Sequence, residues 1–244
     1  MIEINAEGIY YKELNQQIHN YIAEGKKDII IKNVNGQRYI GDALPQGVKL
    51  ELLGTPGNDL AAYMDGAEVI VKGNTQEGTA NTMSGGKLVI HGRSGDATGY
   101  AMRGGKVFVK GDVGYRVGIH MKEYKDMIPA IVVGGNAGSF FGEYMAGGVL
   151  IVLGLDGGAE LVGDYCGTGM HGGVMYLRGE VPSYKLGKEV KSVALNDDDV
   201  KLLSSYVKDF AHYFGYKADE ILKTKFTKLI PYNTRPYGNL YTHY

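Results

Sequence analysis

The sequence of 244 residues contains no tryptophan, six prolines and a single cysteine, Cys166. One cysteine cannot form an internal disulfide bond, a four-cysteine zinc site or an iron–sulfur cluster. A free cysteine is usually a small buried residue, and we expect this of Cys166. The scarcity of cysteine therefore excludes a disulfide-stapled fold and a cysteine-ligated cluster within this chain.

The sequence also lacks a surplus of charge and any long hydrophobic run. Its formal net charge is −1 at pH 7, so nothing favours binding to a phosphate backbone, and nucleic acid is not an expected partner. No stretch approaches the run of about 18 apolar residues that a membrane span needs, and the N-terminus lacks the layout of a signal peptide. We expect a soluble, cytoplasmic protein with no membrane partner.

Glycine is abundant, with 38 residues, about twice the average share. Segments that begin at residues 49, 68, 87 and 106 align with a period of 19, and the phase resumes at residues 130, 149 and 174. Two copies carry insertions, one at residues 122–129 (KEYKDMIP) and one within residues 149–173. Seven copies of this length indicate a solenoid.

The repeated positions hold glycine and methionine. Glycine occupies the sixth position of every copy, and three copies spell GxxGxxxG in full; we expect these residues to shape the corners: Gly54, Gly73, Gly92, Gly95, Gly99, Gly111, Gly114, Gly118, Gly135, Gly138, Gly142, Gly154 and Gly179. A methionine follows in six copies, and we expect these to fill the core: Met64, Met83, Met102, Met121, Met145 and Met170.

Each copy starts with a short alternating strand, and the residues left over are too few for the crossover helix of a βαβ unit. The repeat therefore predicts an all-β core, a parallel β-helix of seven coils that is roughly 30 Å long at about 4.8 Å per strand. Because parallel crossovers are nearly always right-handed, we expect a right-handed β-helix. The expected division is an N-terminal helical cap at residues 1–27, the β-helix at residues 28–181, and a C-terminal helix with an extended aromatic arm at residues 182–244.

The third position of the strands should face outward, yet it is apolar in every copy after the first: Glu51, Ile70, Val89, Phe108, Val132, Ile151 and Tyr176. A strand that is apolar on both faces is usually covered on both. Four members are therefore a candidate interface: Phe108, Val132, Ile151 and Tyr176. Their cover is either the chain's own C-terminal helix or a partner chain, including a second copy.

The flanks contain two amphipathic segments. Residues 11–24 place Leu14, Ile18, Tyr21 and Ile22 at helical spacing before Gly25. Residues 196–214 place five apolar residues on one face, as cover for the apolar column or for the open end of the rod: Val200, Leu203, Val207, Phe210 and Phe214. The tail, residues 228–244, alternates Pro231 and Pro236 with tyrosines, and lies either along its own rod or on a partner.

No motif predicts a catalytic, cofactor or metal site. The stretch KVFVKGDVGYRVGIHM, residues 106–121, resembles the start of a dinucleotide site, but its glycines recur in neighbouring copies without the helix that such a site needs. The histidines show no metal-ligand spacing: His19, His91, His120, His171, His212 and His243.

Three surface features remain as candidates for contacts. The fifth position of the repeat forms a cationic line, either solvated or facing an acidic partner: Lys72, His91, Lys110 and Arg178. Insertions in solenoids become loops that often carry contacts, so residues 122–129 and the longer coil with Asp164, Tyr165 and Cys166 are interface candidates.

The segments GSFFGEYMAGGVLIVLG (138–154) and GTGMHGGVMYLRG (167–179) carry the GxxGxxxGxxM pattern and the GG that follows it. Over residues 28–181 the chain resembles the C-terminal GxGxG domain of the glutamate synthase large subunit, here as a stand-alone chain. The pattern is also similar to the formylmethanofuran dehydrogenase subunit that has the same domain.

The resemblance implies a β-helix that serves as a non-catalytic scaffold and positions separate synthase and amidotransferase subunits, which convert glutamine and 2-oxoglutarate to glutamate. The FMN and the iron–sulfur cluster would belong to those partners, with none in this chain. Two alternatives stay open: a formylmethanofuran dehydrogenase-like complex, and a stand-alone solenoid that binds or cleaves polysaccharide.

Overall fold

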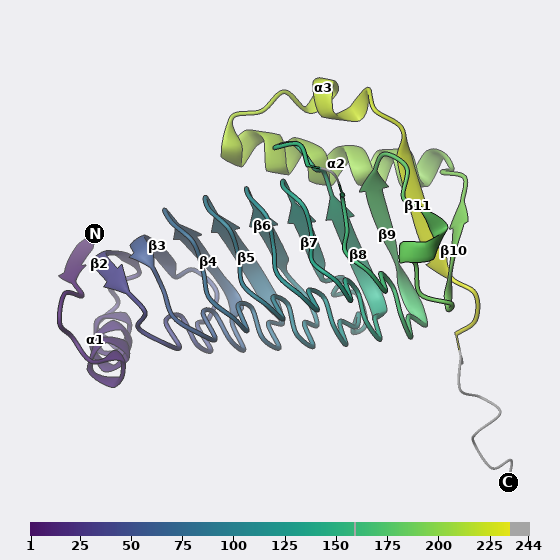
Figure 1. The fold of residues 1–244 in the computed structure, drawn as a ribbon. Helices are drawn as coiled ribbons and strands as arrows, with labels where there is room; N and C mark the ends of the chain where they lie inside the picture. The colour runs from purple at the N-terminus through teal and green to yellow at the C-terminus, as the bar shows by residue number, and fades with distance from the viewer. Residues whose placement is uncertain (159, 235–244) are drawn as a thin grey trace, which may run out of the picture.

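The structure, a computed structural model, describes residues 1–158 and 160–234. Its strands form one sheet in the order β1-β2-β3-β4-β5-β6-β7-β8-β9-β11-β10 (Figure 1). The parallel strands are β1 (Ile2–Asn5), β2 (Asp28–Asn35), β3 (Lys49–Thr55), β4 (Asp65–Val71), β5 (Gly85–Ile90), β6 (Lys106–Val109), β7 (Ala130–Val133), β8 (Ala146–Val152) and β9 (Gly172–Arg178). Each pairs in parallel with the next, as in a β-solenoid.

The repeat supplies the seven strands β3 to β9, and six closed turns of chain connect them. The expected seven coils were therefore one too many. The seventh copy contributes only β9, because the chain then leaves the solenoid and returns as β11 (Phe226–Pro231), which pairs antiparallel with β9 and with β10 (Val190–Val193). These antiparallel strands end the parallel stack.

The interior of the solenoid is packed by ladders of aliphatic side chains. The second and fourth positions of the strands point inward in register, so that Leu88, Val107 and Ile131 are neighbours in one ladder, all at 0% exposure. The six repeat methionines are also fully buried in this cluster. Flexible methionine fills the irregular gaps that stacked β-branched residues leave.

The repeat glycines meet two different constraints. Gly118 has φ +72°, and a Cβ there would lie 2.8 Å from Leu150 Cδ1 of another coil. Gly95 needs no unusual φ, but a Cβ there would lie 2.8 Å from the backbone carbon of Gln76. A left-handed φ together with the approach of Leu150 therefore favours glycine at position 118, and the close approach of stacked backbones alone favours it at position 95.

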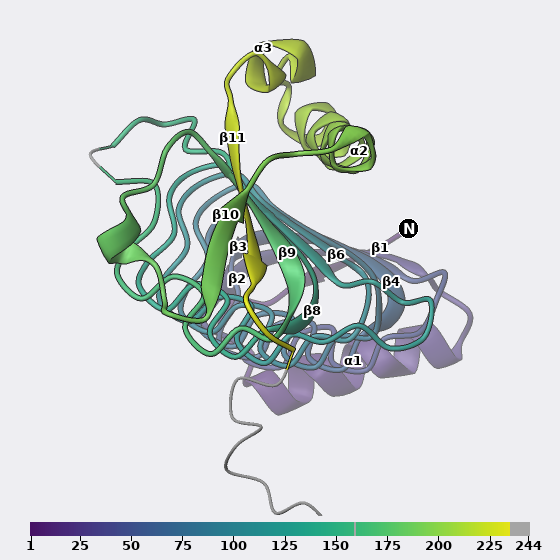
Figure 2. The ribbon, with the colours of Figure 1, turned by 90° about the vertical axis from the view of Figure 1, so that its right-hand side faces the viewer.

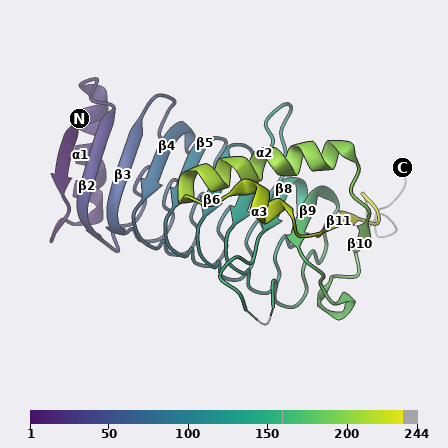
Figure 3. The ribbon, with the colours of Figure 1, turned by 90° about the horizontal axis from the view of Figure 1, so that it is seen from above.

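Helices cover one end and one face of the rod. Helix α1 (Tyr11–Ala23) buries Leu14 and Ile18 in the solenoid core at the N-terminal end, so the predicted N-terminal helix is confirmed. Helix α2 (Asp197–Phe214) runs across the outer face of the sheet, and the short α3 (Ala218–Leu222) follows it (Figures 2 and 3). Asn196 and Asp199 form a capping box at the start of α2.

The flanks contain more structure than the sequence pattern predicted. At the N-terminus, strand β1 was not expected; at the C-terminus, strands β10 and β11, helix α3 and a 3₁₀ turn at Ser183–Lys185 were not expected. The first four residues of the expected aromatic arm, 228–231, belong to β11 and are thus part of the chain's own sheet. After β11, the Tyr232 backbone N–H donates to the Glu189 carbonyl; residues 235–244, with Pro236, Tyr237, Tyr241, His243 and Tyr244, lie outside the described residues.

Candidate functional site

The outward apolar column lies beneath helix α2. Phe108, Val132 and Ile151 are each 0% exposed, and they pack in one cluster with Leu203, Val207, Phe210 and Tyr176. The four residues expected as a candidate interface are therefore buried within this chain and are not available to a partner. The expected intramolecular cover is the arrangement found.

One of the five residues expected on the buried face of α2, Val200, is exposed. This residue is 55% exposed and lines an open groove of about 860 Å³ between the first turn of α2 and strands β10 and β11. At the other end of α2, the ring of Phe214 meets that of His91 at 5.2 Å, edge to face. The helix thus covers the sheet from β5 to β9.

A buried polar anchor fixes the first turn of α2 to the sheet. The Asp199 carboxylate accepts hydrogen bonds from the Tyr176 hydroxyl at 2.6 Å, from Lys228 Nζ at 2.7 Å and from the Asn196 backbone N–H at 2.8 Å. Burial alone would raise the pKa of Asp199, but these three donors outweigh it and hold that pKa below its usual range. Burial, with the bond to Asp199, raises the pKa of Tyr176.

The expected cationic line is not continuous. Lys72 Nζ lies 3.1 Å from His91 Nε2, and burial, followed by the charges of Lys72 and Lys110, lowers the pKa of His91. Arg178 instead donates to the backbone carbonyls of Leu153 and Ile221. The lowered pKa of His91 and the engagement of Arg178 with backbone carbonyls therefore interrupt the line.

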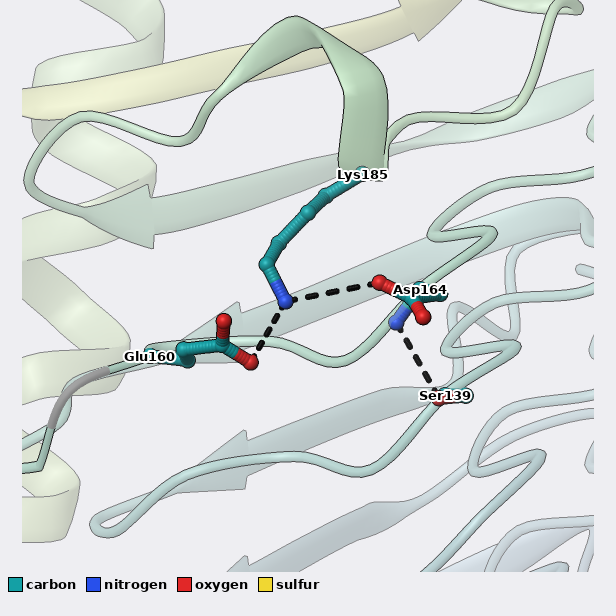
Figure 4. Close-up of polar contacts among 4 residues, drawn as sticks. All are labelled: Ser139, Glu160, Asp164 and Lys185. Atoms are coloured by element: carbon teal, nitrogen blue, oxygen red, sulfur yellow. Dashed lines mark hydrogen bonds and ion pairs between the residues drawn. The ribbon is translucent and has the colours of Figure 1, made fainter.

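The longer coil is tied down by a lysine that the sequence pattern did not single out. Lys185 is 5% exposed, and its ammonium donates to Glu160 at 2.5 Å and to Asp164 at 3.5 Å (Figure 4). The bond to Glu160 raises the pKa of Lys185 against the opposing effect of burial. The Asp164 backbone N–H in turn donates to Ser139 Oγ. The cluster thus ties the loop of the longer coil to the segment that follows the solenoid.

The two insertions lie at opposite ends of the strands (Figure 3). Residues 122–129 precede β7, whereas the insertion that contains Glu160 follows β8. The first insertion exposes Tyr124, Met127 and Ile128. In the second coil, Cys166 is fully buried, and burial raises the pKa of its thiol to about 12. These two candidates therefore do not form one surface.

The irregular half of each coil lies on the side of the solenoid away from α2 (Figure 2). In four consecutive coils it carries rings that contact one another, together with one arginine. We call this set the aromatic ladder: Tyr100, Arg116, His120, Phe140, Tyr144 and Tyr165. The His120 and Tyr144 rings stack at 5.4 Å with 10° between their planes, and Tyr100 meets His120 edge on at 6.0 Å. The Phe140 and Tyr165 rings stack at 5.1 Å.

An arginine and a buried carboxylate complete the aromatic ladder. The Arg116 guanidinium lies 4.8 Å from the centre of the Phe140 ring, and its Nε donates to Glu143 at 3.0 Å. Tyr115 beside it is 54% exposed and Tyr165 is 57% exposed. Of this set, the sequence analysis singled out only Tyr165 as an interface candidate; the signal for the other rings was aromatic residues that follow the corner glycines in several copies.

The next coils on the same side expose carboxylates. Glu77 accepts from Asn58 Nδ2 at 2.8 Å, and Asp96 accepts from the Tyr115 backbone N–H at 2.8 Å. Their backbones are stacked, since Gly78 N–H donates to the Asp96 carbonyl. Within residues 1–158 and 160–234, neither carboxylate forms an ion pair.

The structure offers no geometry for a metal site in the part of the chain that it describes, where no three histidine, cysteine or carboxylate side chains converge. Among the same residues, no helix is both long and apolar enough to cross a membrane.

Comparison with known proteins places the whole chain in one family. An uncharacterized protein of Methanocaldococcus jannaschii is 45% identical over an alignment of 251 residues, which covers 99% of this chain and 96% of that protein. The family model of the GXGXG motif matches residues 11–232, from the start of α1 through β11. The chain therefore belongs to the GXGXG motif family.

Proposed function

We propose that this chain is a non-catalytic scaffold protein of a cytoplasmic glutamate synthase-like complex. In that complex it positions a synthase chain, which carries FMN and an iron–sulfur cluster, against an amidotransferase chain that releases ammonia from glutamine. The observation that carries the proposal is the match of the GXGXG motif to residues 11–232, which includes the solenoid and both of its helical covers.

The packing of the solenoid supports a role as a rigid spacer. Parallel ladders fill its interior, α1 packs into its N-terminal end, and α2 braces five consecutive strands from β5 to β9. Two buried reactive groups of the described chain are engaged in structure: the Cys166 thiol is buried and protonated at neutral pH, and the Asp199 carboxylate is held by three donors. A body of this kind can hold two partners at a fixed separation without taking part in chemistry.

Reconstitution tests the proposal. The chain is co-expressed with a flavin-binding synthase chain and a glutamine amidotransferase chain from the same organism, and the purified assembly is assayed for glutamate formation with either glutamine or ammonia. We expect one complex of all three chains. Omission of this chain should abolish the glutamine-dependent rate and leave most of the ammonia-dependent rate, because only ammonia transfer needs the two active sites to be aligned.

Recovery of a fully active synthase–amidotransferase pair that excludes this chain would overturn the proposal. The resemblance to the GxGxG-containing chain of formylmethanofuran dehydrogenase provides the second candidate. Selective co-purification with chains that carry a molybdenum or tungsten pterin cofactor, in place of the flavin-binding chain, would favour that assembly.

A further inference from the structure

The open groove beside the first turn of α2 has a volume of about 860 Å³ and lies between that turn and strands β10 and β11. Apolar side chains make up most of its walls, and they come from the segment after β9, from the end of β10 and from α2: Val181, Leu186, Val193, Leu195, Val200 and Leu203. Val200 is 55% exposed. Exposed aliphatic groups on a concave surface indicate a contact that the described residues do not complete.

The last described residues of the chain lie a short distance from this groove. The Tyr232 backbone N–H donates to the Glu189 carbonyl at 2.7 Å, and Ser192, in β10, lines the groove. The part of the strand between Glu189 and Ser192 spans about 10 Å. Residues 235–244 come shortly after Tyr232, and a segment of that length spans up to about 33 Å when it is extended. The segment is therefore long enough to turn back over β10 and reach the groove.

The composition of residues 235–244 matches the walls of the groove. The segment has four large side chains with apolar surface: Tyr237, Leu240, Tyr241 and Tyr244. Tyrosine combines a ring that suits aliphatic walls with a hydroxyl that needs a polar partner when it is buried. Ser192 and Ser204 line the same groove, and their hydroxyls can be such partners. Pro236 and Gly238 favour the reversal of the chain that the contact requires.

Covalent linkage favours the chain's own segment over a second copy or another chain as the occupant of the groove. Only Asn233 and Thr234 separate the segment from Tyr232, whose backbone is bonded beside β10. A short linker of this kind gives a tethered segment an effective concentration on the order of 1 mM. A contact with a dissociation constant of about 0.1 mM would then keep the groove filled about nine-tenths of the time, whereas separate copies would have to reach a comparable concentration.

We propose that residues 235–244 turn back over β10 and place their tyrosine rings in the groove of their own chain. The docked segment covers Val200 and joins the first turn of α2 to the end of β10, next to the anchor formed by Asp199 and Lys228. The groove is then filled within the chain and is not a docking site for a partner. This contact does not depend on the scaffold function, because it requires no second chain.

Protection of a cysteine placed in the groove tests the contact. Val200→Cys introduces a small thiol at an exposed position of the groove, and the native Cys166 does not compete because it is fully buried and its pKa is raised to about 12. The rate at which Ellman's reagent modifies the new thiol is measured at pH 8 in the full chain and in a chain that ends at Thr234. The full chain should react about tenfold more slowly, since the reagent reaches only the unoccupied groove.

Two kinds of control variant separate docking from other effects of the tail. Tyr10→Cys places a thiol before α1 at the other end of the rod, where Tyr10 is 61% exposed, and its rate should not change when residues 235–244 are removed. In the full V200C chain, four combined substitutions should raise the rate to that of the truncated chain: Tyr237→Ser, Leu240→Ser, Tyr241→Ser and Tyr244→Ser. Asn239→Ser combined with Thr242→Ser is the matched control and should keep the protection. All variants should show the same circular dichroism.

The outcomes distinguish this contact from a contact between chains. Equal rates for V200C in the full and the truncated chain would overturn the proposal, whether both are fast or both are slow. Protection that survives the four serine substitutions would show that the rings do not fill the groove. Protection that increases with protein concentration, together with a dimer in sedimentation, would assign the groove to the tail of a second copy and also overturn the proposal. The scaffold function is decided separately, by the reconstitution described above.

Discussion

Replacement of Asp199 by asparagine tests whether the buried polar anchor holds α2 on the solenoid. The side chains of Asp199 and Lys228 are only 8% and 14% exposed, and their charged atoms lie 2.7 Å apart. In the variant, the Lys228 ammonium is left buried without its counter-ion, and the new amide group also confronts donors from Tyr176 and Asn196. Removal of one partner from a buried ion pair costs about 3–5 kcal/mol, against about 0–1 kcal/mol for an exposed pair.

The assay is urea denaturation followed by far-UV circular dichroism, since the chain has no tryptophan. Asp198→Asn is the matched control: Asp198 lies in the same helical turn, is 90% exposed and pairs with Lys201 at 3.2 Å. A second variant, D199N combined with Lys228→Met, should recover most of the loss because no buried charge remains unpaired. If D199N and D198N lower the free energy of unfolding by equal amounts, the anchor does not stabilise α2 as argued.

The pH dependence of the same difference follows from the depressed pKa of Asp199. A carboxylate with a lower pKa in the folded state contributes stability that is present above its unfolded pKa of about 3.9 and is lost as the pH falls through the folded pKa. The stability gap between the unaltered chain and D199N should therefore be full at pH 7 and shrink below about pH 4. A gap that stays constant down to pH 2 would contradict the assignment.

Three further changes probe separate parts of the rod. Gly118→Ala should lower the free energy of unfolding by about 1–3 kcal/mol more than Gly8→Ala does. The two positions have nearly the same φ, +72° and +71°, but only at Gly118 would the new methyl group meet another coil. Equal losses in urea titrations would refute the clash. Cys166, with its pKa raised to about 12 by burial, should not react with Ellman's reagent at pH 8 until guanidinium unfolds the chain, and a stoichiometric reaction in the native state would show that it is accessible. Because Glu160 raises the pKa of Lys185, the contribution of Lys185 to the free energy of unfolding should be full below about pH 10.4 and be lost at higher pH. Lys185→Met should therefore speed cleavage by Glu-C protease after Glu160 at pH 8. An unchanged cleavage rate would show that the ion pair does not hold the loop.

The repeat by itself was sufficient to predict the stacked coils, because period and chemistry coincide in every copy. Along each strand, inward-pointing apolar residues such as Val107 alternate with residues that point outward. Glycine recurs at the position of Gly118 in neighbouring copies, where the backbone has a left-handed φ. The amphipathic spacing of Leu14 and Ile18 was equally local, and it predicted α1 correctly. One-sided spacing also predicted α2, but not that Val200 would lie outside its buried face.

Pairings between distant residues carried no periodic signal. Lys228 meets Asp199 only because β11 returns antiparallel beside β9, and Lys185 meets Glu160 only because the chain turns back after the solenoid. The count of turns depended on the same reversal, which replaces a seventh coil. Such contacts join residues that are more than 20 positions apart and do not repeat, so no spacing rule could find them.

The sequence alone determined that this chain is a solenoid with an apolar column that requires a cover, because a period of 19 residues dictates which side chains stack on one another. Only the tertiary structure decided that α2 is the cover, that Phe108 is therefore buried and not an interface, and that the exposed aromatic rings lie on the opposite side. The physical reason is that a repeat specifies neighbours along the rod, whereas the path of the non-repeating C-terminal segment decides which face of the rod remains open to a partner.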